Sequence, residues 1–279
     1  MGAAVNKVGP RGGDRGRATP PFRHAGMGGV FLHCNRSKRS ITLDLKQAEG
    51  VYRSGLEAAR KAGNFSILGR LESFLAAVLY EQNELAAARQ LAQSSLSHNR
   101  IWQNPNHTVH GYLVYTRIAW GMGERETAIK SLEQAEAIAA QAPIVTVLQS
   151  TLQAMRVRID LERGELAQAL RWAQAQPDHP TGVLRDEGVE QVEIAKARVD
   201  IALGNAGAAS RRLDSLEAAA RETGRLNSLV EILILKALAS PDPSTSSQNL
   251  KLALQTGLPR GYLRSYLDAG APLLRMLED

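Results

Sequence analysis

Histidine and cysteine are the residue types in this sequence that most readily bind a metal or act in catalysis. His107 and His110 stand three residues apart at the start of a predicted helix, which places both side chains on one face. A zinc site needs further ligands, and neither an H-E-x-x-H motif nor a cluster of carboxylates accompanies this pair. Cys34 has no neighbours that would lower the pKa of its thiol, and no G-x-S-x-G motif occurs. The sequence therefore predicts a protein that is not an enzyme, with no catalytic residues, metal ligands or cofactor.

Four other side chains are candidates for contacts with a ligand in a groove. Aromatic rings stack on sugars and peptides, and guanidinium groups pair with anionic groups. Packing within a helical core explains the aromatic candidates about equally well, and solvated helix faces explain the arginines. The candidates are Trp102, Tyr112, Arg156 and Arg198. Arg158 could point into the groove as well, and a solvated helix face explains it equally.

The positive charge of the chain is concentrated in its first forty residues. The 279 residues have a formal net charge of +6, but residues 1–40 hold eight basic residues against Asp14 alone. The same stretch is rich in glycine and proline, and such a composition buries too little apolar surface to offset chain entropy. Residues 1–40 are therefore predicted to form a basic, disordered tail. A basic arm that contacts nucleic-acid phosphates is the alternative, although the stretch does not resemble a folded nucleic-acid-binding module.

The rest of the chain has the composition of a helical protein. Aromatic residues make up 5% of the sequence, whereas alanine, leucine, glutamate, glutamine and arginine are abundant. The most apolar stretch, residues 229–239, is interrupted by Glu231 and Lys236 and is too short for a membrane helix. The amino terminus lacks the apolar core of a signal peptide. We therefore expect a cytoplasmic protein without membrane contact.

A turn residue followed five positions later by alanine recurs about every forty residues. Glycine and asparagine can adopt the left-handed backbone conformation that ends a helix, and alanine lets two antiparallel helices approach closely. Before each turn, apolar residues recur at spacings of three and four, as in Leu68, Leu71 and Leu75. The turn residues and their alanines are Asn83 with Ala88, Gly123 with Ala128, Gly164 with Ala169, and Gly204 with Ala209.

This register predicts stacked helical hairpins. A single hairpin cannot bury its apolar face alone, so the hairpins must pack against one another. We predict an all-α, tetratricopeptide-like α-solenoid of about five helical hairpins in a right-handed superhelix over residues 41–258. Residues 259–279 are expected to form a short helical segment that closes it. Weaker copies of the repeat fall at Leu43 and Ser244.

Two passages resemble the MalT-like helical-repeat sensor region of LuxR-type transcription activators. The first runs from Thr223 to Ala239. The second, residues 261–274, reads Gly-Tyr-Leu-Arg and then Asp-x-Gly-x-Pro, the pattern that closes the repeat region in that family. Its residues in this chain are Gly261, Tyr262, Arg264, Asp268, Gly270 and Pro272.

The resemblance implies a sensor, in which a small-molecule effector or a protein partner binds along the concave surface. Full-size family members also carry a nucleotide-binding module and a helix-turn-helix. This sequence has no G-x-x-x-x-G-K-[ST] loop, and seven residues after Pro272 are too few for a helix-turn-helix. We therefore expect the sensor segment of a truncated, split or excerpted regulator, which would contact DNA only indirectly, through a missing or separate module. The alternative is a free-standing tetratricopeptide-type adaptor that binds a protein segment.

Overall fold

The computed structural model describes residues 5–8, 38–41 and 45–278. These residues contain thirteen α-helices, three short 3-10 helices and one two-stranded sheet. The α-helices are α2 (Leu45–Lys61), α3 (Leu68–Glu81), α4 (Leu85–Trp102), α5 (Pro105–Gly121), α6 (Arg125–Gln141), α7 (Thr146–Glu162), α8 (Leu166–Ala175), α9 (Glu187–Ala202), α10 (Ala206–Thr223), α11 (Leu226–Ala239), α12 (Pro243–Gly257), α13 (Arg264–Leu267) and α14 (Ala271–Glu278). The 3-10 helices are η2 (Phe65–Ile67), η3 (Thr181–Val183) and η4 (Leu258–Arg260).

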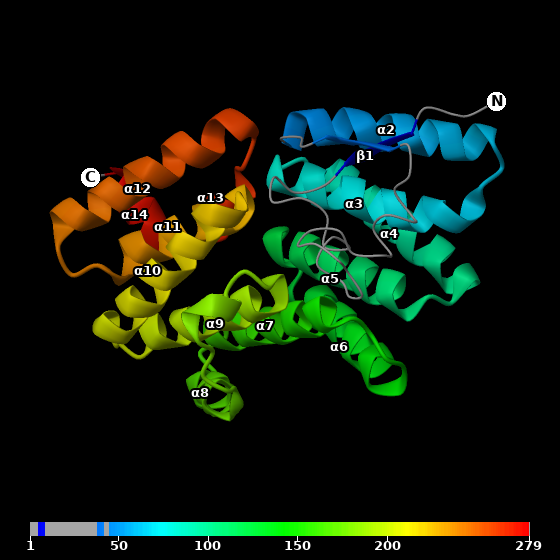
Figure 1. Ribbon diagram of the computed structural model, residues 1–279. Coiled ribbons are helices and arrows are strands. Elements are labelled where there is room, and N and C mark those ends of the chain that lie inside the picture. The colour runs from blue at the N-terminus through cyan, green and yellow to red at the C-terminus, as the bar shows by residue number, and fades with distance from the viewer. Residues whose placement is uncertain (1–4, 9–37, 42–44, 279) are drawn as a thin grey trace, which may run out of the picture.

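Consecutive helices pack as hairpins in which α3, α5, α7, α9 and α11 are the first members and the even-numbered helices α4 to α12 are the second. Helix α2 precedes the first hairpin in the chain and packs on α3. The hairpins follow one another through the molecule rather than surrounding a single centre (Figure 1). The predicted all-α, tetratricopeptide-like fold of about five helical hairpins is therefore confirmed.

Each hairpin of the regular register turns on a residue with left-handed backbone conformation. The φ angles are 65° at Asn83, 80° at Gly123, 77° at Gly164 and 75° at Gly204. The amide of the next residue donates to the carbonyl oxygen five positions earlier, as from Glu84 to Leu79 at 2.8 Å, and this closes the preceding helix. The alanines Ala88, Ala128, Ala169 and Ala209 are completely buried.

The outermost repeats depart from that register. Helix α11 ends at Ala239, and residues 240–242 replace the glycine turn, so Ser244 lies inside α12 instead of at a turn. Asp242 begins α12, because its carboxylate accepts a hydrogen bond from the Thr245 amide at 2.9 Å and Pro243 occupies the first helical position. Leu43 lies outside the described residues.

The apolar core is divided into clusters, and each cluster packs neighbouring helices against one another. One lies among α2 to α5, one joins α5 and α6 to α7, one joins α7 and α8 to α9, and one lies among α9 to α14. We call α2 to α6 the amino-terminal arm and α9 to α12 the carboxy-terminal arm. Figure 1 shows the two arms connected through α7.

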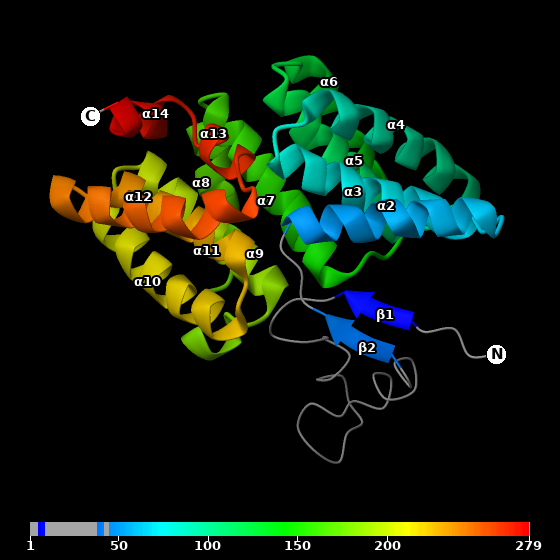
Figure 2. The ribbon, with the colours of Figure 1, turned by 90° about the horizontal axis from the view of Figure 1, so that it is seen from above.

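The described part of the first forty residues is extended. Strands β1 (Val5–Val8) and β2 (Lys38–Ile41) pair in parallel, with Val5 opposite Lys38. Figure 2 shows them beside α2, on the side away from α13. β-Branched residues such as Val5, Val8 and Ile41 favour strands, and pairing satisfies their backbone groups. The prediction of a disordered tail over residues 1–40 did not include these strands; the other residues there, Cys34 among them, lie outside the described ranges.

Candidate functional site

A groove of about 1430 Å³ runs along the first helices of the hairpins. On α5 it is lined by His110, Leu113, Val114 and Arg117, which form one stripe of the helix because they are spaced three and four residues apart. Corresponding stripes come from α3, α7 and α9, and residues of the closing segment line the groove as well. The groove is therefore formed by one face of each of several successive helices.

An arginine occupies the same repeat position in three successive hairpins of this groove. Arg117, Arg158 and Arg198 each precede the glycine of their turn by six residues, and all three line the groove. Each guanidinium is paired with a glutamate: Arg117 with Glu81 at 2.7 Å, Arg158 with Glu162 at 3.1 Å, and Arg198 with Glu231 at 2.8 Å. The positive charge of the arginine row is therefore neutralised by the protein itself.

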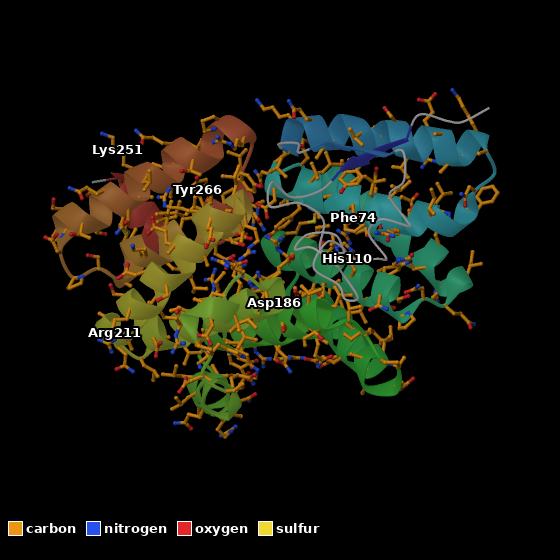
Figure 3. All side chains as sticks on the ribbon, in the orientation of Figure 1. Phe74, His110, Asp186, Arg211, Lys251 and Tyr266 are labelled. Carbon is orange, nitrogen blue, oxygen red and sulfur yellow. The ribbon has the colours of Figure 1, made fainter. Side chains whose placement is uncertain are left out.

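An uncharged histidine packs against an aromatic ring on the wall of the groove. The rings of His110 and Phe74 have centroids 4.7 Å apart, and Figure 3 shows the two residues close together. The Nδ1 atom of His110 is 3.1 Å from the Ser73 hydroxyl. Burial first, and then the charges of His107 and Arg70, lower the pKa of His110 to about 4. At neutral pH this part of the groove therefore presents a neutral imidazole.

The closing segment places a buried carboxylate beside the arginine row. Asp268 accepts a hydrogen bond from the Tyr80 hydroxyl at 2.6 Å and pairs with Arg264, and Arg158 lies 3.6 Å from it. Burial alone would raise the pKa of Asp268, but the charges of Arg158 and Arg117, the Tyr80 hydrogen bond and the charge of Arg264 outweigh it and lower the pKa. Asp268 is therefore held in its ionised form.

The four residues expected in a ligand groove lie in different places. Arg198 lines the groove. Tyr112 packs instead into the apolar core that α5 and α6 share with α7. Arg156 forms a two-bond pair with Glu136, at 2.8 and 2.6 Å, beside a second cavity of about 290 Å³. The side chain of Trp102 lies outside what the structure describes.

Sequence reasoning missed most of the groove, although the repeat register carried a usable signal. The positions six residues before the turns are Ala77, Arg117, Arg158 and Arg198, and all four line the groove. Applying the register of Arg198 to the other repeats would have identified the whole row. His110 was considered only as one of a pair of metal ligands with His107.

The described residues offer no arrangement typical of a metal centre. No group of three or more histidine, cysteine, aspartate or glutamate residues is placed there to hold an ion. The amide of His107 instead donates to the side chain of Asn104, which begins α5, at 3.2 Å. Among the described helices, none has both the length and the apolar character needed to cross a bilayer.

Comparison with known families assigns the two parts of the chain differently. Residues 1–53 match the family model of CoA-transferase family III, a likeness that the composition of this stretch did not suggest. No curated protein matches the sequence. Residues 41–279 match the model of the MalT-like TPR region, which is typical of LuxR-type regulators. This second match covers most of the chain and includes every repeat and the closing segment, and the protein therefore belongs to the MalT-like TPR family.

Proposed function

We propose that this chain is a non-enzymatic, ligand-sensing part of a LuxR-type regulator, and that an effector or a segment of a partner protein binds in the groove. The observation that carries the proposal is the convergence of successive hairpins on one cavity of about 1430 Å³. A ligand there contacts several repeats at once. Its binding energy would therefore favour one packing of the repeats over the others, which is how a sensor changes state.

The arginine row of the groove contributes little net charge toward a ligand. The row is paired with glutamates, so these cations are already compensated. Between the pairs, apolar side chains such as Leu148 and Met155 lie beside polar ones such as Thr151 and Gln191. In a mixed lining of this kind, the apolar side chains bury the apolar surface of a ligand and the polar groups fix the orientation of that ligand.

Any effect on DNA would be indirect in this proposal. A helix-turn-helix module that is separate from the described helices would make the DNA contact, and the groove would supply the signal. The basic residues near the amino terminus have no assigned role in this function.

A thermal-shift screen tests whether the groove binds ligands. The purified chain is heated with individual oligosaccharides, nucleotides, common metabolites and short peptides, because a compound that binds only the native state raises Tm. Gln191→Trp places an indole in the groove from α9, whereas Gln168→Trp makes the same change at an exposed position on α8, outside the groove lining.

The proposal expects a stabilising compound to act on the unsubstituted protein and on Gln168→Trp, and to lose its effect on Gln191→Trp. Equal stabilisation of both variants would place binding elsewhere and contradict the proposal. Stabilisation by peptides and by none of the small molecules would favour the alternative of a tetratricopeptide-type adaptor.

A further inference from the structure

The closing segment joins the two ends of the solenoid. Residues 262–268 follow the last hairpin, yet they pack against the first one, more than 180 positions earlier in the sequence. Figures 1 and 2 both show α13 where the carboxy-terminal arm meets the end of α3. We call residues 262–268 the clasp.

Successive residues of the clasp bind different arms. The Leu263 amide donates to the Glu81 carbonyl oxygen at 2.8 Å, and the Ser265 hydroxyl donates to the Glu81 carboxylate at 2.9 Å, so both hold the amino-terminal arm. The Tyr266 hydroxyl points the other way and donates to the Ala253 carbonyl oxygen at 2.6 Å, within the carboxy-terminal arm. One short segment is thus fastened to both arms.

A pair of clasp residues contacts the end of α3, the first helix of the first hairpin. Arg264 and Asp268 are four residues apart on one helical face and pair with each other. The Arg264 guanidinium lies over the Tyr80 ring, 5.2 Å from its centroid, and the Tyr80 hydroxyl donates to Asp268. Arg158 of α7 also donates to the Asp268 carbonyl oxygen at 3.0 Å. Asp268 therefore connects three parts of the solenoid through one side chain and one carbonyl group.

The amino-terminal arm carries a glycine where the clasp packs against it. Gly121 is the last residue of α5, and a Cβ atom placed there would lie 2.7 Å from the Arg264 guanidinium and 3.2 Å from the Tyr80 ring. A methyl group there would require the Arg264 guanidinium to move away from its place over the Tyr80 ring. The small residue at this position and the charged residues of the clasp are therefore parts of one contact.

We propose that the clasp is a detachable fastener that fixes the distance between the two arms and so sets the width of the groove. Tyr262, Ser265 and Asp268 belong to the clasp and also line the groove, so its release would widen the groove at that end. The contact between the clasp and the amino-terminal arm consists mainly of hydrogen bonds and ion pairs, while each arm has an apolar cluster of its own, so in this proposal the clasp can separate without unfolding either arm. The inference does not depend on what the groove binds.

Double electron–electron resonance, which measures the distance between two spin labels, tests the clasp directly. Spin labels are attached at Lys61→Cys on α2 and Lys251→Cys on α12, in a chain that also carries Cys34→Ser; both label sites are exposed. The unsubstituted clasp should give one narrow distribution of distances between the arms. Gly121→Ala should give a broader distribution with a longer mean, because the new methyl group displaces Arg264.

The matched control is Gly50→Ala in α2, where a Cβ atom would meet nothing within 4 Å. Both substitutions favour helix formation, so a general effect of alanine on stability would appear in both. Asp268→Asn should broaden the distribution in the same way as Gly121→Ala, because it removes the charge that the arginines bind. Circular dichroism shows whether each variant keeps its helices.

Distributions as narrow as the original in both folded Gly121→Ala and folded Asp268→Asn would overturn the proposal, as would equal broadening in Gly50→Ala. Should Asp268→Asn fail to fold, Gly121→Ala still decides the question, since it changes no residue of the clasp. Hydrogen exchange gives a second measurement on the unlabelled chain. The exchange rate of the Leu263 amide should rise in Gly121→Ala and stay the same in Gly50→Ala.

Discussion

The neutral state of His110 predicts a loss of stability in mild acid. In the unfolded chain a histidine has a pKa near 6.5, whereas in the folded protein the pKa of His110 is lowered to about 4. Between these values the unfolded chain binds more protons, so the free energy of unfolding falls as pH decreases. The difference in pKa corresponds to about 2 kcal/mol lost at pH 5 and about 3 kcal/mol lost well below pH 4.

Urea unfolding followed by circular dichroism, repeated from pH 7.5 to pH 4, measures this loss. His110→Gln keeps a polar side chain of similar size beside Ser73 but cannot take up a proton in this range. The free energy of unfolding of the unsubstituted protein should therefore fall more steeply with acidification than that of the variant, by about 2 kcal/mol between pH 7 and pH 5. An independent measurement is the titration of the His110 ring protons by NMR. Equal pH dependence of the two proteins, or an NMR pKa near 6.5, would refute the reasoning.

Two further predictions concern the repeat turns and the buried charges. Gly123→Ala should lower the free energy of unfolding by about 1 kcal/mol, because φ is 80° there, and Gly123→Asn should cost less since asparagine tolerates this conformation; urea unfolding that ranks the two variants the other way would contradict the expectation. Glu190→Ala should cost about 3 kcal/mol, because Glu190 is fully buried with its carboxylate 2.9 Å from the Arg225 guanidinium. Glu222→Ala removes an exposed partner of Arg185 and should cost less than about 1 kcal/mol, so similar losses in these two variants would show that burial does not decide the effect.

The elements of the fold could be predicted because their signals are local. The turns at Asn83, Gly123, Gly164 and Gly204 combine a residue that accepts positive φ with a buried alanine five positions later. Both requirements act within one hairpin and so leave a pattern at a fixed spacing. The short strands near the amino terminus had no such pattern, because their pairing joins Val5 to Lys38 across a long stretch of chain.

The site was harder to predict because neighbouring residues on one helix face different surroundings. Tyr112 and His110 are two positions apart on α5, yet Tyr112 packs into the core and His110 lines the groove. Two positions in an α-helix correspond to opposite faces, and the sequence does not say which face meets the next hairpin. Knowledge of one groove residue would have located its equivalents in the hairpins that turn at Asn83, Gly123, Gly164 and Gly204, since these share one repeat register.

The sequence by itself determined the repeat, the helical hairpins and the family resemblance, since each depends on residues close together in the chain. The tertiary structure decided which helix faces form the groove, which glutamates pair with the arginines of successive repeats, and where the closing segment packs. The pairing of Asp268 with Tyr80 joins residues 188 positions apart. Such a contact depends on the summed curvature of all the hairpins between them, and no single repeat encodes it.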